Sequence, residues 1–249
     1  MNIQSAVVLV TGGGSGIGRC LVDNFIKNNI SIGVFEINRE SINKLKKDYP
    51  KIKIWKCDVA DDQSVKRAFE SMKDENFEPN VLINNAGYIY NESLINISSM
   101  EDRLHSRESW EKVISINLNS VFYMTSRFCN LLTLERKKGV VISISSVCAK
   151  GNRGQVAYSS AKAAVESFMA TSAQELSPLG IRFMTISPGF LNTESTHKSL
   201  NAENLKRLKQ SIPLRSIGNP YFIYQTAKSI IECEYLTGSV IHVDGGIRI

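Results

Sequence analysis

The chain has 249 residues, enough to bury a sizeable core, and α/β folds of this length commonly form one domain, which we expect to span 1–249. No apolar run approaches the roughly 20 residues of a membrane span, and the amino terminus enters a predicted strand without a signal peptide, so we expect a cytoplasmic protein with no membrane partner. The formal charge of +6 is spread along the chain in short runs, which favours solvated charge over a nucleic-acid surface.

The first predicted elements are a strand, a glycine-rich turn and a helix. Residues 6–10 form a short apolar run, 11–18 read Thr-Gly-Gly-Gly-Ser-Gly-Ile-Gly, and apolar residues then recur at helical spacing. Glycines in such a turn let backbone amides approach a pyrophosphate, and the helix N-terminus adds partial positive charge. The pattern therefore predicts dinucleotide binding by Gly12, Ser15, Gly16, Ile17 and Gly18.

Glu36 closes the next predicted strand, about 20 residues after the glycine turn. A carboxylate at this point can accept hydrogen bonds from the adenosine ribose hydroxyls, and it repels the additional phosphate of NADP. We therefore expect the protein to bind a nicotinamide dinucleotide, with NAD(H) as the preferred cofactor and NADP(H) as the less favoured one. Arg19 and Arg39 leave the alternative open, because a cation near the turn could reach a 2′-phosphate.

Two further apolar runs, 53–57 and 81–83, also end in small or polar residues. In an open parallel sheet the carboxyl ends of the strands line the ligand crevice. The residues predicted to contact the cofactor there are Asp58, Val59, Asn85, Ala86 and Gly87. Local explanations remain open, because Asp58 could cap the helix that starts near Asp61, and Asn84 and Asn85 could merely form a turn.

Tyr158 and Lys162 are four residues apart in a predicted helix, which places a phenol and an ammonium on one face. An ammonium can lower the pKa of a neighbouring phenol, so that the phenol exchanges a proton with a substrate oxygen near neutral pH. The same spacing also occurs on solvated helix faces. Together with the dinucleotide turn, however, the pair indicates carbonyl or alcohol chemistry.

These features together resemble the classical short-chain dehydrogenase/reductase family over essentially the whole chain. The shared motifs, in the family's order, are the glycine turn, Asp58-Val59, 84–87, Asn117, a serine at 145–146, Tyr158 with Lys162, 188–193 and 243–246. With the alternation of predicted strands and helices, the resemblance implies an α/β fold of the Rossmann type. We expect a doubly wound parallel sheet of about seven strands with helices on both faces.

The resemblance also implies the roles of the site residues. Tyr158 would be the acid-base group, Lys162 its electrostatic partner and a ligand of the nicotinamide ribose, Asn117 a relay to solvent, and Ser146 the anchor of the substrate oxygen. Counting back 13 residues from Tyr158 gives Ser145 instead, but the alternation along 141–144 favours Ser146. Further cofactor contacts are implied at Pro188, Gly189, Leu191 and Thr193.

The implied reaction is hydride transfer between a nicotinamide and a secondary alcohol or ketone, and it needs no metal. The three histidines and five cysteines show no ligand spacing, and the odd number of cysteines suits a reducing compartment. The alternative is an NADPH-dependent 3-oxoacyl-thioester reductase of fatty-acid or polyketide biosynthesis, acting on acyl-carrier or CoA thioesters. The basic run 206–209 favours that alternative, whereas Leu179 argues against it, because acyl-carrier reductases of the family tend to carry a basic residue there.

Two long segments interrupt the alternation of strands and helices. The segment 88–107 is long and polar, and about 190–211 corresponds to the family's substrate lid. Both would overhang the nicotinamide end of the crevice, so we expect them to select the small-molecule carbonyl or alcohol substrate. Similar proteins assemble as homotetramers or homodimers through helices corresponding to 118–124 and 163–169, and we expect the same assembly here.

Overall fold

A computed structural model of the chain describes all residues except 100, 102, 195 and 197–201. Its centre is a seven-stranded sheet in the order β3-β2-β1-β4-β5-β6-β7, and all neighbouring strands are parallel. The predicted doubly wound sheet is therefore confirmed. The strands are β1 Val7–Thr11, β2 Ser31–Glu36, β3 Lys53–Lys56, β4 Val81–Asn84, β5 Gly139–Ile144, β6 Ile181–Pro188 and β7 Ser239–Val243.

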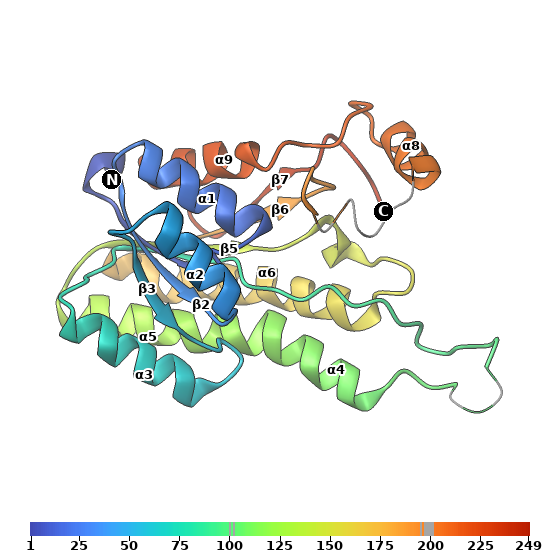
Figure 1. Ribbon diagram of the computed structural model, residues 1–249, viewed down its shortest axis with the longest axis horizontal. Helices are drawn as coiled ribbons and strands as arrows, with labels where there is room; N and C mark the ends of the chain where they lie inside the picture. The colour runs from blue at the N-terminus through green and yellow to red at the C-terminus, as the bar shows by residue number, and fades with distance from the viewer. Residues whose placement is uncertain (100, 102, 195, 197–201) are drawn as a thin grey trace.

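Helices cover both faces of this sheet (Figure 1). One layer consists of α1 Gly16–Lys27, α2 Arg39–Asp48 and α9 Tyr221–Glu232, and the other of α3 Asp62–Asp74, α5 Ser120–Leu134 and α6 Val156–Leu176. Other helices of the described residues include α4 Arg107–Ile114, α8 Ala202–Ser211, the π-helical turn Ser115–Asn119 and the 3₁₀ turns Ile3–Ser5, Val147–Lys150 and Ser177–Leu179. None of the helices in the described part of the chain has the length and apolar character that a membrane span requires.

Each face of the sheet carries its own hydrophobic core, because successive side chains of a strand point to opposite faces. Within β1, Val8 and Val10 pack in the core beneath α1 and α9, whereas Leu9 packs in the core beneath α3, α5 and α6. The strands are thus apolar along most of their length, as strands covered on both faces must be. Their polar positions concentrate at the carboxyl ends, where the site lies.

The order of the strands reverses between β1 and β4, which are neighbours in the sheet although β2 and β3 separate them in the chain. At such a switch point the connections leave in opposite directions and open a crevice above the strand ends. Thr11, the last residue of β1, joins the two sides: its Oγ1 accepts hydrogen bonds from the backbone N–H groups of Asn85 and Ala86, both at 3.0 Å.

The described residues of the segment between β4 and α4, 88–99, 101 and 103–106, form an extended arm that projects beyond α4 (Figure 1). Two backbone hydrogen bonds hold its described parts together as a short antiparallel pair, from Asn96 N–H to the Arg103 carbonyl at 2.7 Å and from His105 N–H to the Leu94 carbonyl at 3.1 Å. We call this segment the β4–α4 arm. Of the predicted lid, 190–211, residues 195 and 197–201 lie outside the described residues, and the C-terminal part is α8.

Candidate active site

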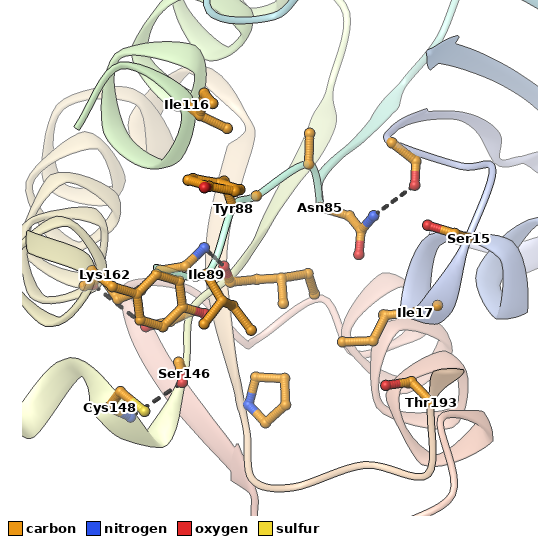
Figure 2. A pocket seen from close by; sticks show the side chains of 18 of the residues that line it. Ser15, Ile17, Asn85, Tyr88, Ile89, Ile116, Ser146, Cys148, Lys162 and Thr193 are labelled. Atoms are coloured by element: carbon orange, nitrogen blue, oxygen red, sulfur yellow. Dashed lines mark hydrogen bonds between the residues drawn. The ribbon is translucent and has the colours of Figure 1, made fainter. Parts of the chain in front are cut away.

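A cavity of about 890 Å³ opens along the carboxyl ends of the strands. Nearly all of the residues that the sequence predicted for the site line it. They are Gly12, Ser15, Gly16, Ile17, Glu36, Asp58, Val59, Asn85, Ala86, Gly87, Ser146, Tyr158, Lys162, Pro188, Gly189, Leu191 and Thr193. Figure 2 shows Ser15, Ile17 and Thr193 on one side of this cavity and Ser146, Cys148 and Lys162 on the other.

The remaining two predicted residues, Gly18 and Asn117, lie behind the cavity wall and support it. A Cβ atom on Gly18 would overlap the carbonyl oxygen of Gly12, so only glycine allows α1 to pack this closely against the turn. Gly12 itself has a φ of +65°, in the left-handed region that favours glycine. Gly12 is therefore required by its left-handed backbone, and Gly18 by the close approach of α1 to the turn.

The carboxylate of Glu36 is buried at the end of β2 and holds the glycine turn in place. Its Oε2 accepts a hydrogen bond from Gly14 N–H at 2.9 Å, and its Oε1 accepts from Ile37 and Asn38 N–H, both at 3.0 Å. Each carboxylate oxygen has more than one acceptor position, so the group can still accept from a hydroxyl of a ligand in the cavity.

The two arginines that could have reached a 2′-phosphate differ in their surroundings. Arg19 pairs with Asp23 at 2.5 Å and with Asp48 at 2.6 Å, and its guanidinium packs over the ring of Tyr49. Arg39 begins α2 and is exposed. Arg19 is therefore engaged by two carboxylates on the outside of the turn, whereas Arg39 remains accessible to solvent.

The ends of β3 and β4 form turns that face the cavity. Asp58 accepts a hydrogen bond from Ala60 N–H at 2.9 Å, whereas the N-terminus of α3 is capped by Asp61. Asn85 donates from Nδ2 to the carbonyl oxygens of Thr11 and Gly12, both at 3.0 Å. Asp58 is thus not the helix cap that its position in the sequence allowed, and Asn85 ties the end of β4 to the glycine turn.

Asn117 is fully buried in the π-helical turn between α4 and α5, a distortion that is frequent at functional sites. Its carboxamide holds both backbone groups of Tyr88, donating to the carbonyl oxygen at 2.9 Å and accepting from N–H at 3.1 Å. A Cβ atom on Gly87 would come within 3.0 Å of the Asn117 Oδ1 and 3.6 Å of the Lys162 Nζ. Asn117 therefore fixes the backbone that passes beside Lys162.

Tyr158 and Lys162 lie on the same face of α6, with the Lys162 Nζ 5.6 Å from the centroid of the Tyr158 ring. The ammonium donates to the carbonyl oxygen of Ile144 at 2.9 Å, and burial lowers the pKa of Lys162 to about 8. Burial also raises the pKa of Tyr158 to about 12, although a hydrogen bond with the Ser146 hydroxyl acts in the opposite direction. The sequence predicted a lowered pKa for this phenol; desolvation outweighs that effect here, because it disfavours the phenolate.

The two candidate serines face different neighbours. Ser146 caps the 3₁₀ turn Val147–Lys150, accepting a hydrogen bond from Cys148 N–H at 3.2 Å (Figure 2). Its hydroxyl also contacts Tyr158. The hydroxyl of Ser145 donates to the Oε1 of Glu166 on α6 at 2.7 Å. Among these two hydroxyls, that of Ser146 lies beside the phenol.

Further residues line the cavity. Four of them, Tyr88, Ile89, Phe190 and Thr196, lie in the two segments that the sequence predicted to overhang the crevice. Those not singled out from the sequence include Lys112, Ile116, Cys148, Asn152 and Gln155. These come from loops and helices whose distance to the crevice depends on the tertiary fold. Within the described residues, no group of His, Cys, Asp and Glu is arranged to hold a metal ion.

Comparisons with known proteins agree with this architecture. A family model described as short chain dehydrogenase matches residues 6–204. A 3-oxoacyl-(acyl-carrier-protein) reductase of Thermotoga maritima is 30% identical over 100% of both chains, and a 3-hydroxyacyl-CoA dehydrogenase type-2 of Drosophila melanogaster is 31% identical over 99% of this chain and 98% of the fly protein. A solved 4-hydroxyisoleucine dehydrogenase complexed with NADH superimposes with a TM-score of 0.88 at 25% identity, covering 97% of this chain and 98% of that one.

Proposed function

The chain belongs to the short-chain dehydrogenase family and is therefore an oxidoreductase acting on CH–OH groups; within this class, we propose that it interconverts a secondary alcohol and a ketone with NAD(H). The observation that carries the proposal is the contact of the Ser146 hydroxyl with Tyr158, beside Lys162, in the same cavity as the glycine turn. A binding protein without catalysis has no need for this combination.

The residues present fit a dinucleotide. Gly12, Ser15, Gly16 and Ile17 line the cavity, and a Cβ atom at Gly16 would meet nothing within 4 Å, so the turn faces open space that suits a pyrophosphate. In the proposal the turn holds the pyrophosphate, Glu36 accepts from the adenosine ribose, and Lys162 binds the second ribose. The bound nicotinamide supplies or accepts the hydride.

The protein's own groups handle the proton. Tyr158 keeps its proton at neutral pH because burial raises its pKa to about 12, so its hydroxyl can donate to a substrate carbonyl oxygen. Ser146 donates to the same oxygen or to the phenolate that remains, and Lys162 stabilises that phenolate by its charge. In ketone reduction the phenol of Tyr158 is thus the acid, and in alcohol oxidation the phenolate is the base.

Two observations support NAD(H) over NADP(H) in this proposal. The Glu36 carboxylate lines the cavity at the end of β2, where a carboxylate disfavours a 2′-phosphate, and Arg19 is engaged by Asp23 and Asp48. The names of the relatives support the alternative, an NADPH-dependent reductase of 3-oxoacyl thioesters, because the Thermotoga maritima protein is a 3-oxoacyl-(acyl-carrier-protein) reductase. The alternative uses the same Ser146, Tyr158 and Lys162.

The test is a fluorescence titration of the protein with NADH and NADPH, followed by assays with free ketones and with 3-oxoacyl thioesters. We expect tighter binding of NADH and oxidation of NADH by free ketones. Tighter binding of NADPH together with turnover of thioesters alone would instead establish the alternative.

The assignment of the acid-base group is tested by Tyr158→Phe. This variant should bind NADH as the unmodified protein does and lose turnover by about 10²-fold or more, because it lacks only the proton donor. Tyr235→Phe is the control, since Tyr235 is fully exposed. Retained turnover in Tyr158→Phe would contradict the proposed role.

A further inference from the structure

The cavity wall beyond Ser146 carries two carboxamides that the proposed proton transfer does not use. Asn152 and Gln155 line the cavity together with Cys148. The Asn152 Nδ2 donates to the Gln155 Oε1 at 3.0 Å and to the Cys148 Sγ at 3.7 Å, and Cys148 N–H donates to the Ser146 Oγ (Figure 2). The carboxamide pair is thus joined to the substrate-oxygen anchor by a short series of contacts.

Gln155 lies close to Tyr158 in the chain and therefore close to the substrate carbonyl that Tyr158 would contact. Gln155 directly precedes α6 and is three residues before Tyr158. Its backbone is not helical, with a φ of −128° and a ψ of 38°, but Gln155 lines the same cavity as Tyr158. A substrate whose carbonyl oxygen contacts Tyr158 can therefore extend a neighbouring substituent toward Gln155.

The β4–α4 arm orients this wall from behind. The Asn91 Oδ1 accepts a hydrogen bond from the Gln155 Nε2 at 2.6 Å, and Glu92 N–H donates to the Gly154 carbonyl oxygen at 2.8 Å. Asn91 does not line the cavity itself. These contacts use one of the two N–H bonds of the Gln155 amide, and no described residue donates to the Asn152 Oδ1. One donor and one acceptor consequently remain for a ligand.

The wall formed by Cys148, Asn152 and Gln155 is uncharged. Within the described lining, the charged side chains are Glu36, Asp58, Lys112 and Lys162. Glu36 ends β2 and Asp58 follows β3, Lys112 packs over the Tyr88 ring at 5.1 Å, and Lys162 donates to the Ile144 carbonyl. No charged side chain belongs to the wall itself, so a substituent that lies against it meets an amide donor and an amide acceptor, which match a neutral polar group.

We propose that Asn152 and Gln155, oriented by Asn91, form a subsite for a neutral hydrogen-bonding group of the substrate, an amide or a hydroxyl, close to the reacting carbonyl. This inference rests on the proposed function, because Ser146 and Tyr158 position the carbonyl. The substrate class is then a ketone with a neutral polar substituent, and not a plain ketone or a keto acid. Asn91 is a positioning residue that acts through Gln155.

The test compares three ketones of nearly the same shape with NADH: acetoacetamide, acetoacetate and 4-methyl-2-pentanone. We expect kcat/KM to be at least about tenfold higher for acetoacetamide than for the other two, because only its amide matches the free donor and acceptor. Gln155→Leu should remove this preference by lowering kcat/KM for acetoacetamide to the values of the other two ketones. A preference that survives Gln155→Leu, or equal values for all three ketones in the unmodified protein, would overturn the subsite.

Asn91→Ala tests the role of the arm. It should raise KM for acetoacetamide severalfold with kcat retained, and it should have no further effect in the Gln155→Leu background, since it acts only through Gln155. Asn96→Ala, in the same arm, is the matched control. An equal effect of Asn91→Ala in both backgrounds would overturn the positioning role.

If no ketone is turned over with NADH or NADPH, the proposed function fails and this inference fails with it. Turnover of all three ketones without preference overturns the inference alone.

Discussion

Ser145 and Ser146 are neighbours in the chain, but their hydroxyl groups lie in different environments. The hydroxyl of Ser146 contacts Tyr158, whereas that of Ser145 donates to Glu166. We expect Ser146→Ala to lower kcat for ketone reduction by about 10²-fold, the effect of losing one donor to a developing oxyanion. Ser145→Ala should leave kcat within about threefold and lower the Tm slightly. The two kcat values and melting curves check this, and a larger loss in Ser145→Ala would reverse the assignment.

Alternation along 141–144 predicted Ser146 as the anchor of the substrate oxygen, because facing in a strand changes with every residue. In the structure both serines line the cavity and the Ser146 hydroxyl is the one beside Tyr158, while the anchor role itself stays a prediction. The electrostatics could not be predicted from the sequence. The pKa of Tyr158 depends on how many atoms surround the phenol, and spacing within a helix does not reveal that number. The sequence therefore predicted a lowered pKa, whereas burial raises it to about 12.

The pKa of Lys162 determines the pH dependence that we expect for the reaction. Burial lowers its pKa to about 8, so the ammonium is the main species below pH 8 and is lost as the pH rises above it. Tyr158 keeps its proton across this range. The initial rate of ketone reduction should therefore fall above about pH 8, because the phenolate that forms loses its stabilising cation.

The check is a pH profile of kcat for the unmodified protein and for Lys162→Arg, with NADH binding measured by fluorescence at each pH as the control. An arginine remains charged at all of these pH values, so the falling limb should move to higher pH even if kcat is lower. A limb at the same pH in Lys162→Arg would assign it to another group.

At the scale of elements, the end of β2 and the glycine turn form one unit. The Glu36 carboxylate accepts hydrogen bonds from the N–H groups of Gly14, Ile37 and Asn38, so it joins the turn to the start of α2. We expect Glu36→Ala to reduce the ratio of NADH to NADPH affinity by about tenfold, since it removes both the ribose acceptor and the repulsion of a 2′-phosphate.

Titrations with both cofactors measure the ratio, and Glu40→Ala, an exposed glutamate in the first turn of α2, is the matched control. Glu36→Gln separates the two effects, because it keeps an acceptor and removes the charge. An unchanged ratio of NADH to NADPH affinity in Glu36→Ala would show that another group distinguishes the two cofactors.

The regular elements could be predicted because their apolar runs are bounded by turns, whereas two irregular ones could not. The π-helical turn Ser115–Asn119 interrupts a helix whose local pattern is continuous, and it is held by the contacts of Asn117 with Tyr88. The β4–α4 arm pairs through a few backbone hydrogen bonds. Both depend on contacts between segments that the sequence does not bring together.

At the scale of the whole molecule, the helical layer of α5 and α6 leaves apolar side chains exposed. Phe122 on α5 is 53% exposed and contacts Phe168 on α6 edge to face, with 6.4 Å between ring centroids. Leu134 at the end of α5 is also exposed. The sequence predicted a homotetramer or homodimer through these two helices, and an aromatic pair at the surface suits an interface with a second copy.

We therefore expect the protein to elute at a multiple of 27.7 kDa and Phe122→Glu to shift it to the monomer, because the partner would have to bury an unpaired carboxylate. Size-exclusion chromatography with light scattering measures both masses. Ile97→Glu is the control, since Ile97 is 81% exposed but lies on the β4–α4 arm, away from α5 and α6. An assembly that survives Phe122→Glu would place the exposed aromatic pair outside any interface, and a monomeric unmodified protein would leave a single chain to supply the complete site.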